Sequence, residues 1–447
     1  MTNVTVKGGT VVTGRGRQRI DLGIRDGSIA AMEPDLAVVG NVIDASGLLV
    51  LPGMVDTHVH LMDPGPTERE DFPTGSAAAA ARGVTTLIEH THAHPIRQAE
   101  DLIEKQRYLA GRSHVDFGLA AHVWPDRIDR LAELWSMGIA FFKVFTCTTH
   151  GVPGLDSSHL LEMLRTVSGF RGICLVHCED ELITADAERV LKQAGRTDPG
   201  VIIEWRSRAA EQAAIALVAS LVRVTGARAT IAHVSTPDGV RVIEEARSAG
   251  ADIAAEACPQ YFALREDEIV EQGPLRKFTP PARIRSDSEE TAMLDLLGSG
   301  AFSHLSTDHA PSTAEQKAAG DIWDSPFGLP GLDSTFPWLL DLALTGTITL
   351  EKAVDLYAEA PARRYALAPR KGTLQPGADA DFLLIDPEST FTLTNANVIS
   401  KAGWSPYADR TFKGRVVATH LRGTEIARDG APHTERRGKF LDGPGAS

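Results

Sequence analysis

Six side chains that can bind a divalent metal stand at or near the ends of short apolar segments. The first segment ends in DTHVH (56–60), and residues two apart on a strand, here His58 and His60, point to the same face. Four later segments end with or close to another such residue: Lys143, His177, His233 and Asp308. A single strand histidine is usually a hydrogen-bonded core residue. Five segment ends that agree indicate instead a mixed N/O site suited to Zn²⁺ or a similar ion.

Lys143 is the least ordinary member of this set, because it interrupts the apolar sequence FFKVF (141–145). An unpaired ammonium buried among apolar side chains is costly. The lysine must therefore be neutralised, paired or chemically modified.

The elements that position these residues form a regular alternation of apolar segments and helices. Strands buried on both faces that alternate with helices predict a parallel sheet. Eight repeats in about 250 residues predict a (β/α)₈ barrel, an α/β fold whose catalytic groups collect at the carboxyl ends of the strands. The predicted strands are 54–61, 85–90, 117–123, 140–145, 173–177, 229–234, 252–258 and 302–308. The predicted helices are 74–82, 96–111, 127–138, 157–168, 204–225, 237–250, 287–298, 337–343 and 350–365.

Both ends of the chain have a different sequence pattern, with short predicted strands separated by turn residues. Residues 1–53 and the chain from Gly372 onward share it. We therefore predict one small β domain, a β-sandwich formed by residues 1–53 with 370–447, and a barrel domain of residues 54–369.

Composition excludes several classes of function. The 447 residues carry 45 Lys and Arg against 59 Asp and Glu, a net charge of −14, which argues against a nucleic-acid binder. No apolar stretch reaches the roughly 18 residues of a membrane span. The opening MTNVTVKG lacks the features of a signal peptide, and the four cysteines include no C-x-x-C pair. We expect a cytoplasmic protein.

Several motifs together resemble the cyclic amidohydrolases, the family of dihydroorotases, dihydropyrimidinases or hydantoinases, and allantoinases. The resemblance covers nearly the whole chain. The motifs are PGMVDTHVHL (52–61), FFKVF (141–145), VHCED (176–180), IAHVSTPDG (231–239), EACPQYF (256–262), FTPPAR (278–283), STDHAP (306–311) and KGTLQPGADADFLLID (371–386).

The resemblance implies two divalent metal ions, with Zn²⁺ favoured and Mn²⁺, Co²⁺ or Fe²⁺ as alternatives. His58 and His60 would bind one ion, His177 and His233 the other. Lys143 would be an N6-carboxylysine that bridges both. A metal-bridging hydroxide would then attack the ring amide carbonyl. Asp308 would bind the first metal and carry the proton to the leaving nitrogen. The implied partner is a small cyclic amide, and relatives are commonly homodimers or homotetramers.

Within that family the sequence resembles allantoinases most. Met62 stands where dihydroorotases have an arginine for the substrate carboxylate. Thr148 stands where hydantoinases commonly have tyrosine, and the turn 63–65 (DPG) is similar to the allantoinase E-P-G turn. Gln260, in contrast, matches hydantoinases.

A histidine triplet, His90, His92 and His94, departs from the family pattern. If the second strand continues, the three side chains share a face. They are solvated loop residues, hydrogen-bond partners of the substrate, or an adventitious metal site. The departure leaves the identity of the ring open.

Five residues are candidates for substrate contacts. Thr148 could donate to the oxyanion or satisfy local backbone, and Thr279 occupies the family's position for a main-chain contact. Gly331 could let backbone approach a ring, although its sequence GLPG (328–331) is also typical of a turn. The full set is Thr148, Gln260, Thr279, Gly331 and His92.

The alternatives to an allantoinase-like enzyme are a hydantoinase or dihydropyrimidinase, and a cyclic imide hydrolase. A non-catalytic scaffold protein of the same family is more remote, because such relatives typically lose metal ligands. A single-metal deaminase does not use a bridging lysine, so Lys143 argues against it.

Overall fold

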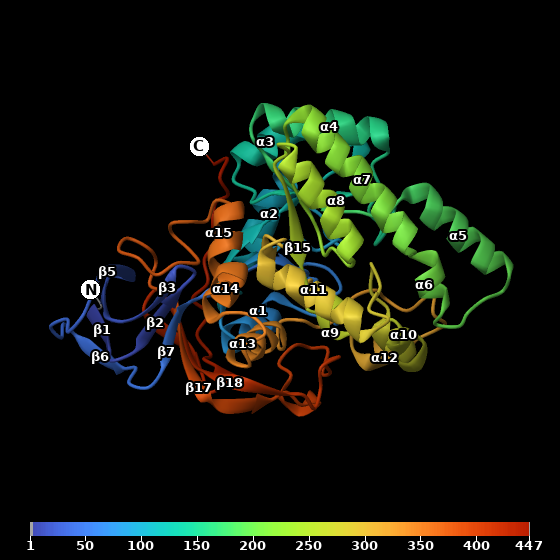
Figure 1. Cartoon of the computed structure of the whole chain (residues 1–447). Helices are drawn as coiled ribbons and strands as arrows, with labels where there is room; N and C mark the ends of the chain where they lie inside the picture. The colour runs from blue at the N-terminus through green and yellow to red at the C-terminus, as the bar shows by residue number, and fades with distance from the viewer. Residues whose placement is uncertain (1–2, 447) are drawn as a thin grey trace.

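The computed structural model describes residues 3–446 and contains a parallel β-barrel surrounded by helices, with a β-sandwich at one side (Figure 1). Each of the eight predicted strands coincides with a barrel strand, the third being interrupted at Ala120. The barrel strands are β8 (Met54–Val59), β9 (Val84–Glu89), β10 (Asp116–Leu119), β11 (Ala121–His122), β12 (Phe142–Phe145), β13 (Ile173–His177), β14 (Arg228–Ile231), β15 (Ile253–Ala257) and β16 (His304–Leu305).

The barrel consists of two parallel sheets, and backbone hydrogen bonds join them at the two places where they meet. Strands β8 to β10 form one parallel sheet and β11 to β16 another. The amide of Ala140, just before β12, donates to the Leu119 carbonyl of β10 at 2.8 Å, which joins the two sheets. At the other seam the amide of His60 donates to the His309 carbonyl at 2.8 Å. The closed ring brings the carboxyl ends of all strands to one opening.

Helices cover the outside of the barrel and follow the predicted segments in most places. The helices are α1 (Phe72–Ala81), α2 (Ala99–Leu109), α3 (Leu131–Ser136), α4 (Ser157–Gly169), α5 (Glu181–Gln193), α6 (Val201–Trp205), α7 (Arg208–Thr225), α8 (Pro237–Ser248), α9 (Gln260–Ala263), α10 (Asp267–Gln272), α11 (Asp287–Ser299), α12 (Ala314–Ala318), α13 (Thr335–Leu344), α14 (Leu350–Val354) and α15 (Ala360–Arg364). Short 3₁₀ or π segments are η1 (Pro125–Arg130), η2 (Gly273–Arg276), η3 (Asp355–Glu359) and η4 (Asn395–Asn397).

Two helix predictions need correction. The predicted helix 204–225 is broken: α6 ends before Arg206, and Ser207 begins α7 by accepting a hydrogen bond from the Ala210 amide. The break allows the buried guanidinium of Arg206 to pair with Glu179 at 3.1 Å. Helix α5, which follows the fifth barrel strand, was not predicted.

Strands from both ends of the chain pair with one another in the β-sandwich. Figure 1 shows β17 and β18, from the C-terminal part, beside β7. One sheet has the order β5-β4-β1-β6, and the other β20-β19-β18-β17-β7-β2-β3. The strands are β1 (Asn3–Lys7), β2 (Thr10–Thr13), β3 (Gly16–Arg19), β4 (Asp21–Arg25), β5 (Ser28–Glu33), β6 (Asn41–Asp44), β7 (Leu49–Pro52), β17 (Phe382–Thr392), β18 (Thr411–Leu421), β19 (Thr424–Arg428) and β20 (Ala431–Pro432).

The sandwich has a small apolar core of its own, which includes Val6, Leu22, Val50, Phe382 and Leu384. The domain limits at 53/54 and 369/370 stay a prediction, and residues 1, 2 and 447 lie outside the described residues. Across residues 3–446, none of the helices combines the length and the apolar character that a membrane crossing requires.

Candidate metal centre and active site

The six residues predicted as metal ligands come together at the carboxyl-terminal opening of the barrel. Three lie on strands β8, β12 and β13, His60 directly follows β8, and two lie in the turns after β14 and β16. A cavity lies between them. It is lined by His58, His60, Lys143, His177, His233 and Asp308, together with His92, Phe145, His150, Phe278, Thr279, Ala310, Phe327 and Gly328.

One group of converging donors involves His58, His60 and Asp308. The Oδ1 atom of Asp308 lies 3.1 Å from His58 Nε2 and 3.4 Å from His60 Nε2. Lys143 Nζ is 3.2 Å from the same Nε2 atom of His58. Two imidazole nitrogens, a carboxylate oxygen and the lysine nitrogen therefore face one point, as a bound cation requires.

A second group lies on the opposite side of Lys143. His177 Nδ1 and His233 Nε2 face each other at 3.0 Å. Ligand atoms of His58, His233 and Asp308 also lie within 4.8 Å of one another. Asp308 and His233 have positive φ angles, 49° and 38°. Such backbone strain gathers at functional sites, where the surroundings hold it in place.

The outer nitrogens of three of these histidines are held by fixed partners. Glu256 Oε2 contacts His58 Nδ1 at 2.8 Å, and Glu179 Oε2 contacts His177 Nε2 at 2.8 Å. His60 Nδ1 contacts the His90 carbonyl at 3.0 Å. Such partners fix the tautomer and the ring orientation of metal-binding histidines. The sequence analysis did not single out either glutamate, although both lie inside the motifs VHCED and EACPQYF.

Burial and neighbouring groups favour the protonation states of the histidines and of Asp308 that bind metal. Burial lowers the pKa of His60 to about 4, and burial likewise lowers the pKa of His177 and His233. Burial acts to raise the pKa of Asp308, but the electrostatic interaction with His58 and the hydrogen bond with His60 outweigh it and hold that pKa below its usual range. Neutral imidazoles beside an ionised carboxylate are the forms that bind cations.

Lys143 fits a carbamate better than an ammonium. Burial lowers the pKa of its amine to about 8, which increases the fraction of the nucleophilic free base. Among residues 3–446, no carboxylate comes within ion-pair distance of Lys143 Nζ, and its near polar neighbour is the imidazole of His58. Addition of CO₂ would convert this nitrogen into an anionic group between the two sets of histidines.

Of the five residues proposed for substrate contacts, two line the cavity, His92 and Thr279. Thr279 Oγ1 donates to Glu179 Oε2 at 2.7 Å. The other three lie outside this lining. Thr148 is exposed, with its hydroxyl accepting from the Gly154 amide at 3.3 Å.

Gln260 and Gly331 are the other two residues outside the lining. Gln260 is buried at the start of α9. The Gly331 amide donates to His309 Nδ1 at 3.0 Å, and a Cβ at position 331 would lie 3.0 Å from Thr307 Cβ. The glycine thus permits close packing beneath the opening.

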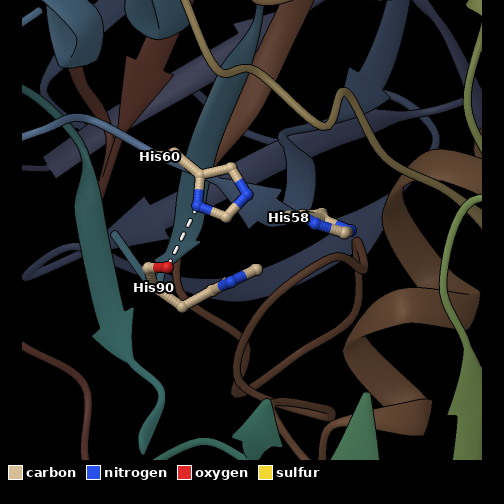
Figure 2. Close-up of side chains that lie close together, drawn as sticks. All are labelled: His58, His60 and His90. Carbon is tan, nitrogen blue, oxygen red and sulfur yellow. Dashed lines mark hydrogen bonds between the residues drawn. The ribbon is translucent and has the colours of Figure 1, made fainter. Parts of the chain in front are cut away.

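The expectation that His90, His92 and His94 share a strand face does not hold, because β9 ends at Glu89 and the chain turns. The His90 side chain is buried against the two histidines of β8 (Figure 2). His92 is half-buried in the cavity wall and His94 is exposed.

The cavity wall also contains groups that the sequence analysis missed. The His92 ring lies 4.6 Å from the ring of His150, and its Nδ1 is 3.3 Å from His122 Nε2. Phe145 packs on His92 at 5.3 Å between ring centroids. His150 sits in a loop with φ 55°, so no strand periodicity could have revealed it.

Comparison with known proteins agrees with this geometry. Residues 49–425 match the amidohydrolase family, and the chain belongs to that family. Curated relatives include an allantoinase of Rubrobacter xylanophilus, 35% identical over 98% of this chain and 97% of its own length. An allantoinase of Escherichia coli is 34% identical over 95% of each chain.

Solved structures extend the likeness to the whole fold. The L-hydantoinase (dihydropyrimidinase) of Arthrobacter aurescens superposes with a TM-score of 0.94 at 30% identity, covering 99% of this chain and 100% of its own. A D-hydantoinase reaches 0.91 at 29% identity over 99% and 98% of the two chains. The fold is thus the (β/α)₈ barrel with an added β-sandwich.

Proposed function

We propose that this chain is a binuclear metal-dependent hydrolase that opens a cyclic amide or ureide, with allantoin as the first candidate substrate. It would act on C–N bonds other than peptide bonds, in cyclic amides. The observation that carries the proposal is the convergence of six donors around one cavity. The allantoinases that are 34–35% identical over nearly the full length support the choice of ring.

In this proposal His58, His60 and Asp308 would hold one divalent ion, and His177 and His233 would hold the other. Lys143, as N6-carboxylysine, would supply an anionic ligand to the centre. Zn²⁺ is favoured by the imidazole donors, with Mn²⁺, Co²⁺ or Fe²⁺ as alternatives. Two such ions supply an acidified water and a polarised amide carbonyl.

Asp308 is the proton carrier of the proposed reaction. Its carboxylate is ionised and reaches the imidazoles of His58 and His60, so it can accept a proton from the attacking water. The same oxygen then delivers that proton to the ring nitrogen as the C–N bond breaks. The rings of Phe145, Phe278 and Phe327 line the cavity and exclude bulk water from the bound ring.

A hydantoinase or dihydropyrimidinase is the second candidate, supported by the TM-score of 0.94 to the L-hydantoinase. A cyclic imide hydrolase shares the same chemistry. The test is hydrolysis of allantoin, hydantoin and dihydrouracil by protein loaded with Zn²⁺ or Mn²⁺ in bicarbonate. We expect the highest kcat/KM on allantoin. Preference for hydantoin would support the second candidate, and no turnover of any ring despite two bound ions would refute both.

We also propose a cytoplasmic location and a homodimeric or homotetrameric assembly. The four cysteines, Cys147, Cys174, Cys178 and Cys258, are buried and free, which supports a reducing compartment. The assembly rests on the family resemblance. Light scattering of the purified chain gives the molecular mass, and a monomer would contradict it.

A further inference from the structure

The side chain of His90 lies directly against the two histidines of β8. Its ring centroid is 4.6 Å from that of His58 and 4.5 Å from that of His60. Figure 2 shows the three imidazoles grouped together, with the His90 carbonyl accepting from His60. One ring nitrogen from each of the three lies within 4.8 Å of the others.

The His90 imidazole is buried and lacks hydrogen-bond partners. Its exposed fraction is 1%, and neither Nδ1 nor Nε2 has a partner among residues 3–446. Buried ring nitrogens are normally satisfied, and one that is not calls for an explanation such as a bound ion. Its other close neighbour is the apolar ring of Phe141, at 5.4 Å, which offers no hydrogen bond.

We infer that His90 is a third imidazole ligand of the ion held by His58 and His60. This inference rests on the proposed binuclear centre and adds a ligand to it. Nitrogen ligands of one Zn²⁺, each about 2.1 Å from the ion, lie roughly 3 Å apart when the ion has five or six ligands. Approach from within 4.8 Å to that separation is a movement of at most about 1.8 Å, within reach of side-chain rotation.

A third imidazole would make the two halves of the centre unequal. The ion at His58 and His60 would have three nitrogen ligands besides Asp308 and Lys143, whereas the ion at His177 and His233 would have two. Imidazole donors favour Zn²⁺ and Co²⁺ over Mn²⁺. We expect the first equivalent of Zn²⁺ or Co²⁺ to fill the site that contains His90.

The first test is a crystal structure of the wild-type protein loaded with Zn²⁺ in bicarbonate. We expect a His90 nitrogen at about 2.1 Å from the ion bound by His58 and His60. A His90 ring that stays more than about 3 Å from that ion would overturn the inference. Absence of two bound ions would instead refute the proposed function, so the two failures are distinguishable.

The second test compares His90→Leu with His420→Leu, a buried histidine of β18 that stacks on Phe382 in the β-sandwich. Both variants keep the His90 carbonyl that orients His60. We expect His90→Leu to weaken Co²⁺ binding at one site by about 100-fold or more, since even outer partners contribute 10–100-fold. The visible absorption of the bound Co²⁺ should change as well. His420→Leu should bind two ions as the wild type does.

Two Co²⁺ ions bound by His90→Leu with wild-type affinity and spectrum would exclude ligation by His90. Circular dichroism of each variant establishes that it is folded. If His90→Leu does not fold, His90→Asn and the wild-type crystal structure decide the question.

Discussion

The two sides of the cavity are built differently, although both are rich in histidine. The metal-binding side consists of residues at strand ends, and its imidazoles have fixed partners such as Glu256 and Glu179. The adjoining wall contains His92 and His150, which lie in loops and contact mainly other rings, including that of His60 at 4.2 Å from His92. The first arrangement holds atoms in place for chemistry, and the second shapes the space available to a ring.

This difference separates the part of the cavity that the barrel holds in place from the part that its loops can change. Strand ends of a closed barrel are fixed by backbone hydrogen bonds, so ligands placed there keep their geometry. The loops that follow the strands can vary in sequence and length without destabilising the barrel. Substitutions on the metal-binding side should therefore affect metal content and turnover together, whereas those on the wall should affect substrate preference alone.

The largest effect is expected for Lys143→Ala. The variant cannot form the bridging carbamate, and loss of several kcal/mol of charge stabilisation corresponds to roughly 10⁴-fold in turnover. Metal analysis should show fewer than two ions per chain. Added acetate or propionate should restore part of the activity, because its carboxylate can occupy the space left by the missing carbamate. Wild-type turnover with two ions bound would refute the carbamate.

A smaller effect is expected for Asp308→Asn. The amide retains an oxygen near His58 and His60 but cannot carry a proton, and general acid–base catalysis contributes about 10²–10⁴-fold. We expect kcat to fall by about that factor, with KM little changed. Thr307→Ser, a neighbour whose hydroxyl donates to the His58 carbonyl at 3.2 Å, serves as the control and should retain activity. An unchanged kcat in Asp308→Asn would assign the proton transfer elsewhere.

Glu256→Gln should have an intermediate effect through the orientation of His58. The carboxylate is buried, and the positive charge of His58 outweighs burial and holds its pKa below the usual range. Loss of such a partner typically costs 10–100-fold in metal affinity. Titration with a competing chelator measures this cost.

The control for that titration is Glu211→Gln. Glu211 is equally buried but accepts from the Ser235 amide at 2.9 Å rather than from a metal ligand. It should bind metal with the wild-type affinity. Equal losses in both variants would indicate a general effect of burying an amide rather than the orientation of His58.

The same contrast explains how far the sequence could predict the molecule. His58 and Lys143 lie on apolar strands and His60 directly follows one, so a period of two and strand-end position locate these side chains without coordinates. The barrel followed from the eight apolar segments that alternate with helices. The fixed register of the closed sheet then places all six donors at one opening.

The sequence could not predict the positions of side chains in loops, because these depend on where the chain turns after a strand ends. The alternation of His90, His92 and His94 suggested a shared face, but the turn after Glu89 sends them to three environments. His150 reaches the cavity only because its loop adopts a positive φ. The break at Arg206 depends on a partner, Glu179, that is distant in sequence.

The smallest effect is expected for His92→Ala, which tests the wall. The His92 ring packs on that of His60 at 4.2 Å but is absent from the groups of converging donors, so we expect two bound ions. Loss of its contact area should lower kcat/KM by roughly tenfold, about 1.4 kcal/mol, and alter the ratio between allantoin and hydantoin. His94→Ala is the matched control, since His94 is exposed two residues away and should leave both rates unchanged. If His92→Ala instead loses a metal ion, the wall is part of the metal centre and the division of the cavity into two sides is wrong.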